Sequence, residues 1–171
     1  DEKTAYVFVS QSGETADTIG ALREVKKQGG LTLGIINVVG SSVAREVDAG
    51  LYNHVGPEIG VASTKAFTSQ VALLSLLAVF FANRKGTLLP ELTGELRKIP
   101  EAMGRVLKRA KDMERLAKKY VKAENALYIG RKYQYPIALE GALKLKEISY
   151  VHAEGFSGGE LKHGPIALVD E

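Results

Sequence analysis

The sequence contains no cysteine, and this absence excludes two structural classes at once. Neither a disulfide framework nor a thiolate metal site can form. The three histidines do not show the spacing of metal ligands either. We therefore expect a protein without a metal centre, in a reducing compartment such as the cytoplasm.

Long apolar runs and a strong charge imbalance are also missing. The longest apolar stretch, residues 71–82, is short for a bilayer span and predicts a buried helix. We expect no signal peptide. The formal net charge is +3, and many basic residues lie between Arg97 and Lys122 with helical periodicity. A solvated helix face explains them more simply than nucleic-acid binding, so neither a membrane nor a nucleic acid is an expected partner.

Apolar, strand-like segments alternate with helical patterns along most of the chain. The predicted strands are residues 4–9, 31–37, 49–54, 125–130 and 150–154, and residues 166–169 are predicted to begin another. The predicted helices cover residues 15–28, 42–47, 61–83 and 137–149. This βαβ pattern predicts an α/β fold of three layers, with a parallel sheet flanked by helices.

A different kind of segment lies between these two halves. Pro100 is predicted to divide it, and residues 103–120 then carry one continuous apolar stripe with lysine and arginine opposite. The stripe indicates an amphipathic connector helix.

A small, hydroxyl-rich turn, Ser10–Thr15, joins the first strand to the first helix. Such a turn is either an ordinary helix cap or a site for an oxyanion at the positive end of the helix. Ser41, Ser42 and the segment Val61–Ser63 occupy equivalent places at later strand exits and a helix start. In an open parallel sheet these points share the carboxyl edge, where ligands bind. Neutral hydroxyls and amides can donate to a phosphate and can both donate to and accept from sugar hydroxyls, so the sequence favours a sugar phosphate. The glycine motifs of nucleotide sites are absent.

Two further features could carry chemistry. Lys144 and Glu147 are three residues apart on a predicted helix, either as a surface ion pair or as a partly buried pair whose carboxylate acts as a base. His163 lies in a predicted loop, where it is either simply exposed or able to transfer protons near neutral pH. His54 and His152 lie in strand-like contexts and are interpreted as structural.

Four stretches resemble one known family. Residues 10–18, 58–68, 135–150 and 160–165 closely resemble, in this order, the sugar isomerase (SIS) domains of the glutamine–fructose-6-phosphate aminotransferases. The resemblance implies conversion of fructose 6-phosphate and ammonia to glucosamine 6-phosphate, with no metal or organic cofactor. It also implies a homodimer, because in this family the histidine at the position of His163 reaches the site of a neighbouring subunit.

The resemblance assigns roles to nine residues. The implied phosphate-binding residues are Ser10, Gln11, Ser12 and Thr15. Ser63 and the backbone of Val61 are implied sugar contacts. The implied catalytic residues are Glu147 as the base between C1 and C2, Lys144 as a polarising group and His163 as the group that assists ring opening.

The resemblance also implies a domain layout. Residues 1–87 would be the later half of one SIS domain, residues 88–124 a helical connector and residues 125–171 the early part of a second. The chain would then be an internal fragment without the glutaminase domain, upstream strands or carboxyl-terminal tail. The family sheet has flavodoxin-like order, so strands of the second copy could complete the first sheet as a hybrid. A non-catalytic sugar-phosphate-binding module and an inactive fragment are the alternative functions.

Overall fold

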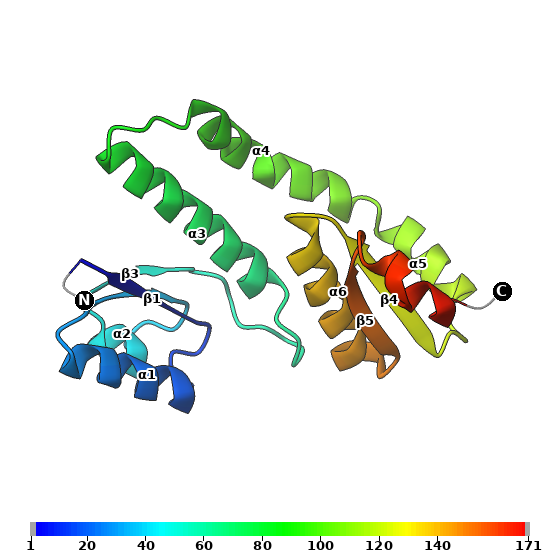
Figure 1. Ribbon diagram of the computed structural model, residues 1–171, viewed down its shortest axis with the longest axis horizontal. Coiled ribbons are helices and arrows are strands. Elements are labelled where there is room, and N and C mark those ends of the chain that lie inside the picture. Colours follow the sequence, from blue (N-terminus) through cyan, green and yellow to red (C-terminus); the bar gives the residue numbers. More distant parts are fainter. Residues whose placement is uncertain (1–2, 170–171) are drawn as a thin grey trace. The chain divides into compact units, whose positions relative to one another are not determined.

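The computed structural model describes residues 3–169, which divide into two compact units (Figure 1). One unit comprises the chain up to Ile59 together with Ser63–Glu101. The other comprises Gly60–Ala62 and the chain from Ala102 onward. The division into two half domains and a connector stays a prediction.

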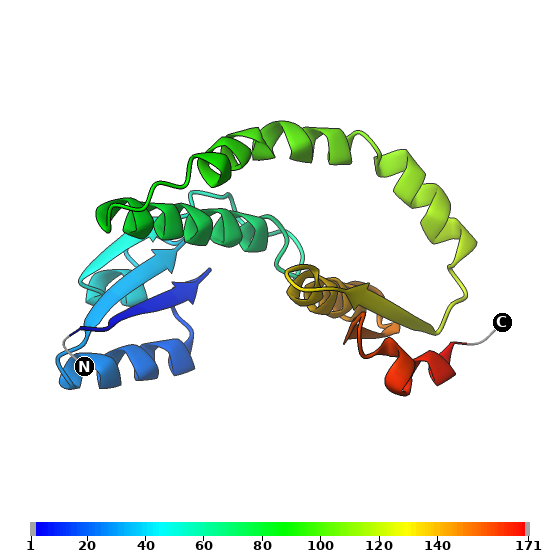
Figure 2. The same cartoon turned by 45° about the horizontal axis from the view of Figure 1, so that its top comes forward.

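The first unit is a three-stranded parallel sheet between helices. Its strands are β1 (Ala5–Ser10), β2 (Leu31–Ile36) and β3 (Ala49–Tyr52), hydrogen-bonded in that order. Figure 2 shows α1 (Ala16–Lys27) on one face and α3 (Lys65–Arg84) on the other; α2 is Ser42–Glu46. The parallel α/β architecture with flanking helices is therefore confirmed, and β1 and β2 end at the same edge, where Ser10 is opposite Ile36.

The core of this unit lies between the sheet and helices α1 and α2. Leu22, Ile36 and Val43 are essentially inaccessible, and Phe8 and Ile19 pack against them. Ile19 and Leu22 are three residues apart and therefore lie on the same face of α1. Burial of these apolar side chains is the main force that holds the strand exits in place.

A carboxylate joins β2 to the turn that precedes β3. Asp48 Oδ2 accepts hydrogen bonds from the Thr32 hydroxyl at 2.7 Å and the Thr32 backbone N–H at 2.9 Å. Lys26 Nζ lies 3.0 Å from the other carboxylate oxygen. The Thr32 hydroxyl, the Thr32 N–H and Lys26 together lower the pKa of Asp48 to about 2.

This shift predicts a loss of stability in acid. An unfolded aspartate binds its proton near pH 3.9, above the pKa of folded Asp48, so the contribution is present above that pH and is lost as pH falls toward about 2. The Asp48→Asn variant should be less stable at pH 7 and should show a shallower acid decline. Urea unfolding between pH 7 and acid tests this, with Glu24→Gln on α1 as the control. Equal pH slopes for wild type and Asp48→Asn would contradict it.

The prediction that residues 71–82 form a buried helix is half wrong. They lie within α3, but only Ala66 and Val79 of this helix are buried. By length and composition α3 could cross a membrane, with a mean hydropathy of 1.7 and 11% of the window buried. The core helix of a soluble protein can have the same length and apolar composition. The apolar composition predicted the helix correctly, but a cavity lies between α3 and the sheet face, so the sheet does not bury the helix.

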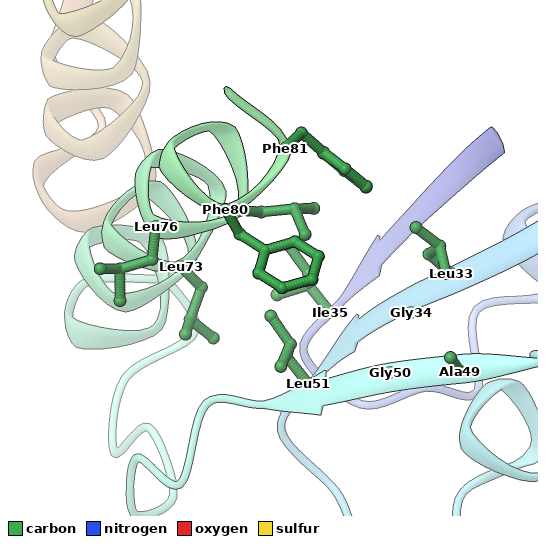
Figure 3. A pocket seen from close by; sticks show the side chains of 11 residues that line it. Leu33, Gly34, Ile35, Ala49, Gly50, Leu51, Leu73, Leu76, Phe80 and Phe81 are labelled. Atoms are coloured by element: carbon green, nitrogen blue, oxygen red, sulfur yellow. The ribbon is translucent and has the colours of Figure 1, made fainter. Parts of the chain in front are cut away.

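An apolar cavity of about 430 Å³ separates α3 from the sheet. In Figure 3, Leu73 and Phe80 point from α3 toward Ile35 and Leu51 of the strands. None of the predicted site residues lines this cavity. A lining without charged side chains suits an apolar group and not a sugar phosphate.

The second unit contains a two-stranded parallel sheet, β4 (Asn125–Gly130) and β5 (His152–Ser157). Helix α6 (Gln134–Ser149) packs against both strands and buries Ala138 and Ala142. The remaining elements are α5 (Ala110–Lys119) and the 3₁₀ helices η1 (Leu161–His163) and η2 (Pro165–Leu168). The sequence prediction of a strand, a helix and a second strand here is confirmed.

Three predictions about these segments are wrong. The hybrid sheet does not form, because β4 and β5 pair with each other in a sheet separate from β1–β3. Pro100 does not divide the segment but lies inside α4 (Pro90–Leu107). Its ring fixes φ at a value that a helix allows, and it lacks the N–H that would bond the carbonyl one turn earlier. Because α4 has no buried residue, water can bond that carbonyl instead. The continuous stripe is instead interrupted between α4 and α5.

The predicted strand at residues 166–169 is a 3₁₀ turn, η2. Gly164, at φ 139°, and Pro165 start this turn. An apolar run becomes a strand only when a neighbouring strand offers its hydrogen-bonding edge, and among the described residues β4 and β5 pair only with each other.

Candidate functional site

The loops that follow β1 and β2 are hydrogen-bonded to each other. Gly13 O accepts from the Val43 N–H at 3.0 Å, and Glu14 Oε1 accepts from the Ser42 N–H at 2.7 Å. The Ser42 backbone bond lowers the pKa of Glu14 and keeps it ionised. The expectation that the Ser10–Thr15 turn and the Ser41–Ser42 turn meet at the carboxyl edge is confirmed.

The Ser10–Thr15 turn is shaped by its own hydroxyls. Ser10 Oγ accepts from the Gly13 N–H at 2.9 Å, and Ser12 Oγ accepts from the Glu14 N–H at 3.2 Å. Thr15 occupies the N-cap position of α1, but its side chain makes no capping hydrogen bond. The first-turn N–H groups of α1 are therefore not satisfied by the cap, which is the arrangement that an oxyanion needs.

Two buried polar atoms at this edge lack a hydrogen-bond partner among the described residues. They are Ser41 Oγ, at the N-cap of α2, and Asn53 Nδ2, directly after β3. Buried polar atoms are normally paired with protein or water, since an unpaired one costs free energy. Both atoms are enclosed by the surrounding protein, so each is an unpaired polar group next to the strand exits.

The predicted sugar contacts lie just before α3. Val61 is fully exposed, and Ser63 is half-buried. Glu58 accepts the N–H of Thr64 at 2.8 Å and of Ala66 at 2.9 Å. Among residues 3–169, no hydrogen bond joins Ser63 to the Ser10–Thr15 turn.

The Lys144–Glu147 pair lies on α6, as the spacing predicts. Lys144 Nζ is 2.5 Å from Glu147 Oε2 and 3.4 Å from Glu140 Oε1. The side chains of Lys144 and Glu147 are 20% and 32% exposed, so the pair is partly buried. The bond to Glu147 and the nearby charge of Glu140 raise the pKa of Lys144, which stays cationic at neutral pH.

His163 is the last residue of η1 and is exposed. Within the described chain, no hydrogen bond or ion pair connects it to Lys144 or Glu147. The structure thus joins Lys144 to Glu147 and leaves His163 outside that cluster. The predicted loop around His163 contains a single 3₁₀ turn.

The sequence reasoning did not single out three carboxylates of this region. Glu140 contacts the predicted residue Lys144, Glu14 contacts Ser42, and Glu58 contacts Thr64 and Ala66 beside the predicted sugar contacts. Glu140 precedes Lys144 by four residues, a spacing that could have revealed it. Glu14 and Glu58 each bind backbone N–H groups at the start of another helix. The sequence carries no comparable signal for Glu14, because its partner Ser42 is distant in the chain.

Comparisons with known proteins agree with this architecture. The family model of the SIS domain matches residues 1–80 and 119–171. Two curated relatives are glutamine–fructose-6-phosphate aminotransferases (isomerizing) of Bacteroides thetaiotaomicron and Aquifex aeolicus. Each is 52% identical and aligns with 99% of this chain. The chain spans 28% of the length of each relative.

Solved structures show the same similarity. The C-terminal domain of glucosamine-fructose-6-phosphate aminotransferase from Francisella tularensis superposes with a TM-score of 0.94 at 44% identity, covering 99% of this chain and 49% of that one. Glucosamine-6-phosphate deaminase from Thermotoga maritima gives a TM-score of 0.77 at 25% identity, covering 100% of this chain and 51% of that one. The chain therefore belongs to the SIS domain family.

Proposed function

We propose that this chain is part of the isomerase portion of a glutamine–fructose-6-phosphate aminotransferase. This enzyme would form glucosamine 6-phosphate from fructose 6-phosphate and ammonia. The observation that carries the proposal is the alignment of 99% of the chain, at 52% identity, with relatives of that name. The geometry of the carboxyl edge and of α6 supports it independently.

The phosphate would bind at the Ser10–Thr15 turn. Backbone N–H groups at the start of α1 and the hydroxyls of Ser10, Ser12 and Thr15 would donate to its oxygens, with Gln11 beside them. The helix dipole adds a favourable field there. Val61 and Ser63 would contact the sugar.

The proton transfer would use the cluster on α6. Ammonia would condense with the C2 ketone of the open sugar, with loss of water, to give the C2 imine. Glu147 would then take one proton from C1 and return it at C2, while the hydroxyl proton of C1 passes to the imine nitrogen and C1 becomes the aldehyde carbon. Lys144, which remains cationic, would stabilise the negative charge that develops on the oxygen at C1. His163 would take the proton from the ring hydroxyl and donate one to the ring oxygen when the sugar opens.

The remaining expectations belong to the same proposal. This chemistry needs an acid, a base and a cation, so we expect neither a metal nor an organic cofactor. We expect a cytoplasmic homodimer that binds neither nucleic acid nor membrane. Helix α3 would then be a helix of the α/β domain, in line with the hydrogen bond from Ser69 to Asn53 Oδ1 at 3.3 Å.

Calorimetry on this chain tests the binding half of the proposal. We expect weak binding of fructose 6-phosphate, competition by glucosamine 6-phosphate and no binding of unphosphorylated fructose. Ser12→Ala should weaken the binding, whereas Lys98→Ala on exposed α4 should not. A folded sample that binds neither sugar phosphate would contradict the proposed site and favour a purely structural role.

A chimera tests the catalytic half. This chain would replace the aligned segment of the Aquifex aeolicus relative, which is 52% identical. We expect the chimera to make glucosamine 6-phosphate and the isolated chain to show little turnover. A folded chimera that binds fructose 6-phosphate without converting it would instead indicate a non-catalytic sugar-phosphate module.

A further inference from the structure

The segment between Glu58 and Thr64 makes few interactions that would hold its conformation. Within the described chain, residues 56–63 form no backbone–backbone hydrogen bond. The side chains of Ile59 and Val61 are fully exposed, and Ala62 is the buried residue of the segment. A loop of this kind samples many conformations unless its ends are fixed.

One carboxylate fixes both ends of this segment. Glu58 Oε1 accepts the backbone N–H of Thr64 at 2.8 Å and of Ala66 at 2.9 Å, and Oε2 accepts the Thr64 hydroxyl at 3.0 Å. Thr64, the N-cap residue of α3, makes no side-chain capping bond itself. Glu58 therefore caps α3 from a position six residues upstream of Thr64 and closes the loop between them.

The chemistry of the cap suits a permanent closure. The bonds to Ala66 and Thr64 lower the pKa of Glu58, so its carboxylate is ionised at neutral pH. A negative charge at the positive end of a long helix is electrostatically favourable. The closure therefore persists across the neutral pH range.

We propose that Glu58 is a positioning residue that holds the segment Ile59–Ser63 in the conformation that binds the sugar. This inference rests on the proposed function, in which Val61 and Ser63 contact the sugar and the Ser10–Thr15 turn binds the phosphate. Glu58 would act on the sugar part of the ligand alone, because its hydrogen bonds go to the start of α3 and not to the phosphate turn.

Two substitutions separate geometry from charge. In Glu58→Gln the amide oxygen can still accept both backbone N–H groups, and the amide nitrogen can donate to the Thr64 hydroxyl. Glu58→Ala removes all three bonds. The expected order of fructose 6-phosphate affinity is therefore wild type, then Glu58→Gln within about twofold, then Glu58→Ala about fivefold to tenfold weaker.

Comparison of two ligands on the full chain gives the decisive readout. Calorimetry with fructose 6-phosphate and with inorganic phosphate should show that Glu58→Ala weakens the binding of the sugar phosphate and leaves the affinity for inorganic phosphate unchanged. Glu14→Ala, which alters the phosphate turn, should weaken both ligands. Glu24→Ala on the exposed side of α1 should change neither. Equal weakening of both ligands in Glu58→Ala would show general destabilisation and overturn the proposal, as would unchanged binding of both.

Hydrogen exchange separates this inference from the proposed function. The amides of Thr64 and Ala66 should exchange faster in Glu58→Ala than in wild type or Glu58→Gln. If the wild-type chain binds fructose 6-phosphate no more tightly than inorganic phosphate, the segment Ile59–Ser63 does not contact the sugar, and the inference about Glu58 is wrong. If neither ligand binds but exchange responds as expected, the proposed site fails and Glu58 is only a helix cap.

Discussion

Replacement of Glu147 by glutamine is expected to abolish the formation of glucosamine 6-phosphate by the chimera while sugar-phosphate binding persists. A glutamine amide cannot accept a proton from carbon, so the general-base contribution of about 10²- to 10⁴-fold in kcat is lost. Lys144 keeps Glu140 as a partner at 3.4 Å, so the substitution does not leave an unpaired cation. Steady-state kinetics and calorimetry on the same preparation measure both quantities.

The matched control is Glu154→Gln. This carboxylate lies on β5 with a side chain 47% exposed, and it should leave kcat unchanged. A fall in binding equal to the fall in kcat would assign Glu147 to substrate binding. Retention of more than about a tenth of the activity would contradict its assignment as the base.

Replacement of Gly13 by alanine is expected to cause the largest loss of stability in the phosphate turn. Gly13 has φ +69°, a left-handed conformation that disfavours a side chain, and an added Cβ would overlap Ser41 Oγ. Backbone strain and steric overlap together should lower the free energy of unfolding by roughly 2–4 kcal/mol. Urea unfolding followed by circular dichroism measures this loss, and calorimetry should show weaker phosphate binding.

Two further variants separate the backbone strain from the steric overlap. Gly20→Ala, in the middle of α1 with no atom within 4 Å of the added Cβ, should stabilise the protein by roughly 0.5–1 kcal/mol. Ser41→Gly in the Gly13→Ala background should recover the steric part and leave the backbone part. Wild-type stability of Gly13→Ala would show that the turn relaxes without cost.

Local sequence patterns predicted the features that depend on near neighbours. The run Ala5–Val9 and the hydroxyls after it predicted β1 and its exit, because apolar β-formers and a helix start are encoded within a few residues. The Lys144–Glu147 contact follows from helical spacing alone. These predictions needed no knowledge of the rest of the chain.

Features that depend on distant partners were not predictable in this way. The apolar composition of α3 predicted burial, but burial requires a second surface, and much of Phe80 remains exposed. Ile166 and its neighbours were predicted as a strand, but a strand requires an edge to pair with. The Glu58 cap reaches across a loop, where no periodicity links donor and acceptor.

The carboxylates of Glu14 and Glu58 have one more consequence, for the charge of the ligand. They already occupy the N–H groups at the starts of α2 and α3, so two of the helix termini near this edge carry their own anion. Among the starts of α1, α2 and α3 in the described chain, that of α1 receives no such carboxylate hydrogen bond, and its N-cap residue Thr15 makes no capping bond. A sugar with one phosphate matches this pattern, whereas the second phosphate of a bisphosphate would compete with a built-in carboxylate for its donors. Under the proposed function, this distribution of carboxylates would favour a monophosphate through charge, independently of any contact with the sugar hydroxyls.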